Sequence, residues 1–266
     1  MNNQQWARRI KRAEELASRY PFAAELLNFY AQIANFQEAV FSRASADQFP
    51  AATIDENLGA QRISALLSSF EEFLSLVIRI APQPLRDSAH DWEHRGREEW
   101  ARLLDRCWQE KSFPAEDQSH WFLARAFLQP YAELVRQNIS FSSQVRHPFV
   151  CPVCSQKAVC GILRQQGDGG QRWLQCSFCT AEWEFRRIVC PGCGEEDDRK
   201  LPVYVQDTFD YVRVECCESC KQYIKTIDLT RNGLAEPLVD EIASAPLDLW
   251  AREHGYSKLA LNLLEM

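Results

Sequence analysis

Four Cys-x-x-Cys pairs lie within 70 residues of this chain, and they constrain its fold more than any other feature. The pairs are Cys151/Cys154, Cys176/Cys179, Cys190/Cys193 and Cys217/Cys220. Two residues between thiolates let a tight turn aim both sulfurs at one ion, and two such turns supply the four ligands of a closed tetrahedral site. The eight cysteines therefore predict two four-cysteine metal sites.

The region that holds these pairs is an internal repeat. Cys-Pro-Val-Cys at 151–154 matches Cys-Pro-Gly-Cys at 190–193, and an arginine, Arg172 or Arg213, precedes the third cysteine of each copy by four residues. The second and third cysteines are separated by 21 residues in one copy and 23 in the other, which suits a returning hairpin. Four pairs can combine into two sites in three ways, and the repeat favours sequential pairing. The predicted ligands are Cys151, Cys154, Cys176 and Cys179 for site 1, and Cys190, Cys193, Cys217 and Cys220 for site 2.

Three of the 11 cysteines have no counterpart in the repeat. We expect Cys107 and Cys160 to pack in the core, because unoxidised cysteine behaves as a small apolar residue. Cys216 adjoins Cys217, so packing, exchange as a ligand and a redox role all stay open for it. None of the five histidines lies inside the repeat, and we expect His90 and His94 to lie on a solvated helix face. Both sites are therefore predicted to be all-sulfur.

The sequence leaves the metal and its role open. All-thiolate tetrahedral sites suit Zn²⁺ and a single rubredoxin-type iron, so the ions either stabilise the ribbons or transfer electrons. The chain contains no Gly-x-Gly-x-x-Gly, P-loop or Gly-x-Ser-x-Gly motif. This pattern favours a protein that is not an enzyme, with a redox role as the open alternative.

Composition and charge limit the cellular compartment and the classes of partner that we expect for this chain. The first ten residues lack the apolar run of a signal peptide, and no segment has the roughly 20 apolar residues of a membrane span. We therefore expect a cytoplasmic protein, where clustered cysteines bind metal more often than they form disulfides. The net charge is −7, and residues 148–232 carry 11 Lys and Arg against 12 Asp and Glu. This balance disfavours nucleic acid as a partner.

The expected fold is multi-domain α + β. Apolar periodicity predicts five or six helices before the cysteines, within stretches at Trp6–Tyr20, Phe22–Arg43, Asp55–Ile80 with Asp55 as the N-cap, Leu85–Glu110 and Asp117–Asn138. Alternating runs at Ala158–Leu163 and Tyr211–Val214 predict strands, and the turn Gly167–Gly170 predicts a hairpin. The expected units are a helical bundle at 1–147, two rubredoxin-like or zinc-ribbon modules at 148–189 and 190–232, and a helical C-terminal tail at 233–266.

At the level of motifs, the chain resembles the FdhE family of formate dehydrogenase accessory proteins. The similarity lies in Arg12-Ala-Glu-Glu-Leu-Ala with Pro21-Phe-Ala, and in Cys-Pro-Val-Cys followed by Arg-Trp-Leu-Gln-Cys-Ser-Phe-Cys-Thr-Ala-Glu-Trp. It continues through Cys-x-x-Cys-Gly and Val-Glu-x-Cys-x-x-Cys-x-x-Tyr-Ile-Lys. The departure is Cys216, where the family more often has a small polar residue. Cys216 could replace Cys217 as a ligand, but the spacing to Cys220 favours Cys217.

The resemblance implies a cytoplasmic factor for the assembly of molybdenum- or tungsten-containing formate dehydrogenases, acting on the catalytic subunit before export. It also implies rubredoxin-like centres in which the eight paired cysteines hold iron. Two alternatives stay open from the residues alone: a redox module that alters the client's active site, and a zinc-ribbon adaptor for nucleic acid. The oligomeric state is left open.

Overall fold

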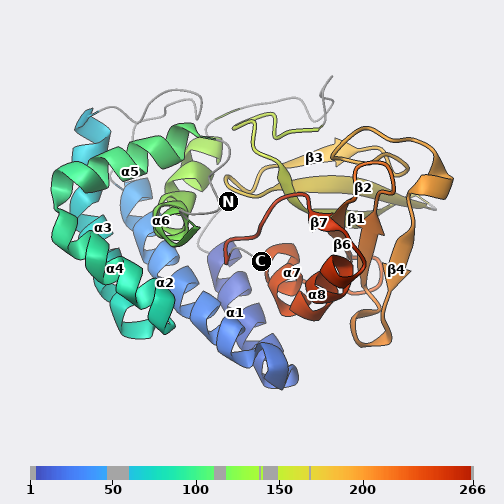
Figure 1. The fold of residues 1–266 in the computed structure, drawn as a ribbon, viewed down its shortest axis with the longest axis horizontal. Helices are drawn as coiled ribbons and strands as arrows, with labels where there is room; N and C mark the ends of the chain where they lie inside the picture. Colours follow the sequence, from blue (N-terminus) through green and yellow to red (C-terminus); the bar gives the residue numbers. More distant parts are fainter. Residues whose placement is uncertain are drawn as a thin grey trace.

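A computed structural model describes the arrangement of the chain. It describes residues 4–46, 60–110, 118–137, 139, 149–167 and 169–264. The helices of the N-terminal half form one side of the molecule, and a twisted sheet forms the other (Figure 1). The predicted domain boundary at 147/148 lies outside the described residues.

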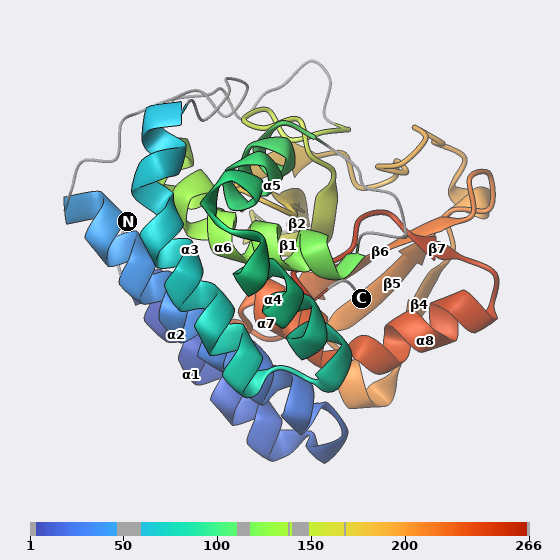
Figure 2. The ribbon, with the colours of Figure 1, turned by 60° about the vertical axis from the view of Figure 1, so that its left-hand side comes forward.

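The N-terminal half is helical, as the apolar periodicity predicts. Its helices are α1 (Gln4–Arg19), α2 (Ala24–Ala46), α3 (Ala60–Ile80), α4 (Gln83–Arg95), α5 (Arg97–Gln109) and α6 (Gln118–Gln137). The predicted stretch Leu85–Glu110 is two helices, because Gly96 adopts a φ of +81° between α4 and α5. Glycine reaches this left-handed conformation without the steric cost that a Cβ imposes. Figure 2 shows α1, α2 and α3 running side by side.

The cysteine-rich half forms one seven-stranded sheet. Its strands are β1 (Ala158–Gln166), β2 (Gly169–Cys176), β3 (Glu182–Phe185), β4 (Val203–Val205), β5 (Val212–Cys216), β6 (Gln222–Asp228) and β7 (Ser257–Lys258). The predicted strands and the β1–β2 hairpin are present, although Asp168 in the turn lies outside the described residues.

The two copies of the repeat fold alike and lie side by side in this sheet. The strand order is β3-β2-β1-β6-β5-β4, so each copy contributes three antiparallel strands in the same spatial order. The copies join through β1 and β6, which pair in parallel from Cys160↔Lys225 to Leu163↔Asp228. The hydrophobic runs predict the strands but not this seam, because parallel pairing joins segments far apart in sequence.

The C-terminal tail is only partly helical, which corrects the prediction of one helical segment up to Leu263. It forms α7 (Pro237–Ala243) and α8 (Ala245–Glu253), and then the short strand β7, which pairs in parallel with the start of β6. Gly255, with a φ of +82°, follows α8 and leads into this strand. The tail therefore adds a short strand to the sheet after its two helices.

Buried charges attach α7 and α8 to the sheet. Lys225 of β6 is fully buried, and its Nζ lies 2.6 Å from Asp248 Oδ2 and 3.0 Å from Glu241 Oε1. Tyr223, two residues earlier on the same face of β6, donates from its hydroxyl to Asp248 Oδ1 at 2.7 Å. Lys258 adds a second cation beside the same two carboxylates. Buried charges require this mutual pairing, because an unpaired charge in the interior is costly.

The helical half docks against this layer through α1. Arg12 donates to both carboxylate oxygens of Asp240 in α7, at 2.6 and 3.0 Å, and Tyr211 donates to the same carboxylate at 2.8 Å. Arg9, one turn earlier, pairs with Glu133 of α6 at 2.8 Å. Helix α1 thus connects the bundle to the C-terminal layer. Within the described residues, no helix combines the length and the apolar character needed to cross a membrane.

The parallel seam provides a test of the packing between the copies. A Cβ on Gly161 of β1 would lie 2.3 Å from Oγ1 of Thr226 on β6. We expect Gly161→Ala to lower the free energy of unfolding by about 1–3 kcal/mol, because the added methyl overpacks the seam. Adding Thr226→Ala to this variant should restore most of the loss. Denaturant unfolding followed by circular dichroism measures both effects.

Gly169 is the matched control for this test. A Cβ there would lie 4.0 Å from its nearest neighbour, the carbonyl oxygen of Gln166. Gly169→Ala should therefore change stability by less than about 0.5 kcal/mol. Equal losses from the two glycine substitutions would contradict a tightly packed seam.

Candidate metal centres

The four Cys-x-x-Cys pairs form four copies of one tight turn. In each copy the N–H of the first cysteine donates to the carbonyl of the residue five positions later, at 2.8–2.9 Å. The residue after the second cysteine is left-handed in every copy, with φ between +55° and +80°. These residues are Ser155, Thr180, Gly194 and Lys221. Three of them carry a Cβ in a conformation that costs non-glycine residues about 1 kcal/mol or more.

Backbone N–H groups also point at the sulfurs. The amides of Val153, Phe178 and Gly192 donate to Sγ of Cys151, Cys176 and Cys190 at 3.3–3.4 Å. Such bonds stabilise a thiolate, because they place positive dipoles beside its charge. The turns therefore present sulfur as an anionic ligand.

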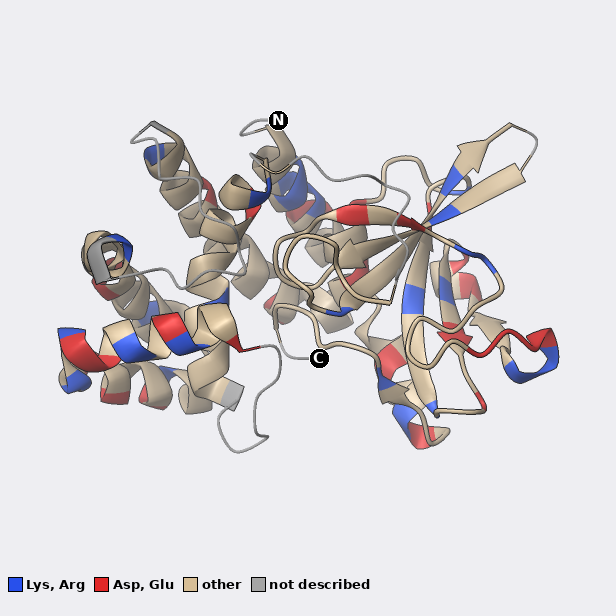
Figure 3. Cartoon of the chain, turned by 90° about the horizontal axis from the view of Figure 1, so that it is seen from above, with Lys and Arg blue, Asp and Glu red and all other residues tan. Residues whose placement is uncertain are grey.

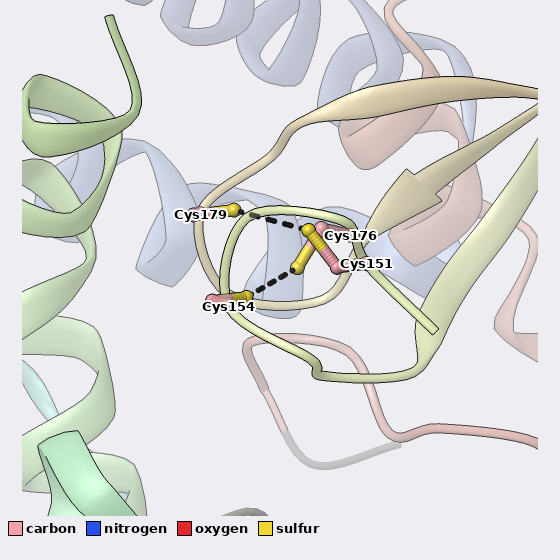
Figure 4. A group of neighbouring side chains, drawn as sticks. All are labelled: Cys151, Cys154, Cys176 and Cys179. Carbon is pink, nitrogen blue, oxygen red and sulfur yellow. Dashed lines mark hydrogen bonds between the residues drawn. The ribbon is translucent and has the colours of Figure 1, made fainter. Parts of the chain in front are cut away.

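The structure brings the eight sulfurs into two groups of four. Each group combines two Cys-x-x-Cys pairs that follow one another in the sequence, as the repeat predicts. In site 1, the closest sulfur pairs are Cys151–Cys179 at 3.6 Å and Cys154–Cys176 at 3.3 Å (Figure 4). In site 2, Cys190–Cys220 and Cys193–Cys217 are 3.7 and 3.6 Å apart. Within each group all four sulfurs lie within 4.8 Å of one another.

These distances fit a metal better than disulfides. A disulfide bond is about 2.05 Å long, well below the closest separations. Four sulfurs at about 2.3 Å from one tetrahedral ion would lie about 3.8 Å apart, close to the separations seen. Each group can thus hold one metal ion, and an all-sulfur donor set selects soft or borderline metals such as zinc and iron. That the eight cysteines bind metal stays a prediction.

Site 1 also favours a thiolate before any metal arrives. Burial opposes ionisation of Cys176, yet hydrogen bonds from the thiols of Cys151, Cys154 and Cys179 hold its pKa well below the usual value. The N–H of Phe178 acts in the same direction. The thiolate form of Cys176 is therefore favoured within the group.

The helical half covers site 1. Arg125 of α6 donates to Oγ of Ser177 at 2.8 Å, and its guanidinium lies 5.2 Å from the ring of Phe178. Trp108 of α5 packs edge-on against the same ring at 5.8 Å. Ser177 and Phe178 are the two residues between Cys176 and Cys179, so two helices pack directly on one of the Cys-x-x-Cys turns. All four cysteines of site 1 are buried.

Site 2 is more open than site 1. Cys190 and Cys217 are buried, Cys220 is half-buried and Cys193 is exposed. A cavity of about 350 Å³ borders the site and is lined by Cys190, Gly192 and Cys217 together with apolar side chains of the sheet and the preceding segment. The tertiary structure thus makes the two groups of cysteines unequal in exposure.

The three remaining cysteines lie outside both groups. Cys107 is buried in α5, and Cys160 is buried in β1, where its thiol faces Oε1 of Gln175 at 3.6 Å. Cys216 is buried at the end of β5, opposite Tyr223 in register. Burial, with the nearby carboxylates of Glu218 and Glu215, raises the pKa of Cys216 to about 12. A protonated thiol is neither a good nucleophile nor a metal ligand, so Cys217 is the better ligand.

No histidine belongs to either four-cysteine group within the described residues. His90 and His94 are exposed on α4, and Nδ1 of His94 lies 2.7 Å from the carbonyl oxygen of His90. The two residues therefore lie on a solvated helix face.

Cys216 should resist alkylation in the folded protein at pH 8. With a pKa of about 12, only about one molecule in 10,000 carries the thiolate at this pH, and the side chain is buried. Iodoacetamide labelling followed by peptide mass spectrometry measures the modification, with the denatured protein as the reference. Labelling of native Cys216 at the rate of the denatured protein would contradict its burial in β5.

The fold and the two sites define a class: a helical bundle joined to a double ribbon that carries two four-cysteine groups. Family models match the same region, with the FdhE central domain at residues 150–187 and the FdhE C-terminal domain at residues 188–264. Residues 150–264 of the chain are therefore similar to the FdhE family, as the cysteine motifs indicate.

Relatives align along nearly the whole chain. An FdhE homologue from Aquifex aeolicus is 28% identical over 96% of this chain and 93% of its own length. One from Haemophilus influenzae is 27% identical over 97% of this chain and 87% of its own length. The crystal structure of the FdhE protein from Pseudomonas aeruginosa superposes with a TM-score of 0.71, at 23% identity, covering 100% of this chain and 97% of that one. This likeness confirms the fold, including the helical N-terminal half.

Proposed function

We propose that this protein is a cytoplasmic accessory factor for the maturation of formate dehydrogenase, and that it binds the catalytic subunit before export. It acts as a binding protein rather than as an enzyme. The observation that carries the proposal is the match to both FdhE domains across the two four-cysteine groups. The alignment with FdhE homologues over most of the chain supports it further.

We propose further that the eight paired cysteines hold two mononuclear metal ions in rubredoxin-like sites, with iron favoured over zinc by the family resemblance. When bound, each ion cross-links two turns, and iron adds the capacity for one-electron transfer. The chain itself supplies the turns, the N–H groups that face the sulfurs and the helical cover of site 1. Closed zinc–thiolate sites in small peptides contribute on the order of 10 kcal/mol to folding, so metal binding and ribbon folding should be coupled.

The charge distribution supports a protein client rather than nucleic acid. Basic and acidic segments are intermixed over the helices and the sheet in the view of Figure 3. The exposed apolar side chains include Val203 and Val205 of β4 and Leu249 of α8. Exposed apolar groups suit contact with a protein, whereas nucleic-acid binders present a concentrated basic surface.

The client proposal predicts capture of one particular partner. Tagged full-length protein, purified with its metal, should retain the catalytic subunit of formate dehydrogenase expressed without its other subunits. Protein stripped of metal by a chelator under denaturing conditions and refolded without metal should lose this binding, because the ribbons would lack their cross-links. An absence of binding under both reducing and oxidising conditions would overturn the client proposal.

The metal proposal predicts two equivalents of metal per chain. Protein purified without added metal should contain two iron ions and show a ferric–thiolate charge-transfer band that disappears on reduction. Cys151→Ser should lower the content to about one equivalent, whereas Cys160→Ala should leave it at two, because Cys160 lies outside both groups. Colourless protein with two zinc ions would refute iron and favour a structural role, and protein that binds no metal would refute both.

A further inference from the structure

The two copies of the repeat differ at one turn. In site 1, ligand Cys154 lies between Val153 and Ser155, and it is 4% exposed. In site 2, the equivalent ligand Cys193 lies between two glycines, Gly192 and Gly194, and it is exposed. A glycine carries no side chain that could cover its neighbour. The Gly-Cys-Gly sequence therefore leaves the thiol of Cys193 open to solvent.

The surroundings of the two sites increase this difference. Arg125 and Trp108 of the helical half pack on the Ser177–Phe178 turn of site 1. At the equivalent turn of site 2, Ser219 contacts the half-buried Glu195, and Glu218 contacts the exposed Lys221 and accepts a hydrogen bond from the buried Tyr256 of the C-terminal tail. This turn is thus held partly by surface contacts, which are weak in water.

A route of approach to site 2 exists from the sheet side as well. Cys190 and Cys217 line the cavity of about 350 Å³, together with the apolar side chains of Ile188 and Val203. Ile188 is 57% exposed, so the cavity opens at the surface. Every ligand of site 2 therefore either lines this cavity or is itself exposed or half-buried, whereas all four ligands of site 1 are buried.

We propose that site 2 is a ligand-exchange site, at which the thiol of an incoming molecule displaces Cys193, while site 1 holds its metal as a fixed structural centre. The proposal rests on the proposed metal binding by the eight cysteines. In the exchange, the incoming thiol forms one sulfur–metal bond as the bond to Cys193 breaks, and the thiol's proton passes to the Cys193 thiolate. No electron is transferred. The class of incoming ligand is a thiol, because an all-sulfur site favours replacement of sulfur by sulfur.

The test follows metal exchange in the full-length protein loaded with two equivalents of zinc. The protein is mixed with isotopically enriched zinc and dithiothreitol, and native mass spectrometry counts the ions replaced over time. We expect one ion to exchange at least about tenfold faster than the other, with a rate that rises with dithiothreitol concentration. Equal rates for both ions would overturn the proposal. A protein that fails to load two ions would instead refute the metal sites themselves, and the exchange proposal with them.

Variants assign the fast ion to site 2. Gly192→Val recreates the Val153 of site 1 and should slow the fast exchange at least about tenfold, because it covers Cys193. The added Cβ would lie 2.4 Å from Oε1 of the Gln222 side chain, which can move aside, and 3.4 Å from Cδ1 of Leu259. Arg125→Ala should speed the slow exchange by removing the cover of site 1. Cys160→Ala, a buried cysteine outside both groups, is the control that should change neither rate.

The same variants can also refute the assignment of the fast-exchanging ion to site 2. A fast exchange that persists unchanged in Gly192→Val would show that exposure of Cys193 does not set the rate. If the fast phase belonged to site 1, Arg125→Ala would accelerate that phase. This result would overturn the proposal. Circular dichroism of each variant confirms that the helices and the sheet are retained before the rates are compared.

Discussion

Convergence of four cysteine sulfurs within 4.8 Å of one another is the constraint on which the rest of the ribbon layer depends. No apolar packing requires thiols to meet in this way, and three of the four turns that present them place a side chain in a left-handed conformation. Ionised together in the interior, four thiolates would repel one another strongly without a cation. A bound metal ion would offset both the backbone strain of these turns and the repulsion between their thiolates.

The rest of the fold serves to place these turns relative to one another. Each copy of the repeat builds a three-stranded antiparallel sheet, and the parallel pair of β1 with β6 fuses the copies into one layer. Lys225, Glu241 and Asp248 hold the C-terminal helices on this layer, and Arg12 with Asp240 attaches the bundle. Buried ion pairs of this kind contribute little net stability, but they penalise every arrangement that leaves a charge unpaired. They therefore specify how the helical half and the sheet meet.

The docking of the bundle makes the two sites different. Helices α5 and α6 pack on a turn of site 1, so its cysteines lie at the junction between the two halves of the molecule. Site 2 belongs to the second copy of the repeat and lies beside a surface cavity. The two copies of one motif thus form a buried site between the helical half and the sheet, and an open site that other molecules can approach.

The sequence by itself determined the number of sites, their sequential pairing, the helical character of the first half and the hairpin between β1 and β2. These features are local: they depend on spacing, on periodicity and on turn residues such as Gly167. It predicted neither the break at Gly96 nor the end of the tail in β7, because periodicity alone does not register a single left-handed residue or a two-residue strand. Only the tertiary structure decided that the copies share one sheet, that Cys216 is a buried bystander and that Cys193 is exposed. Each of these depends on which distant segments pack together, and burial is a property of that packing rather than of a motif.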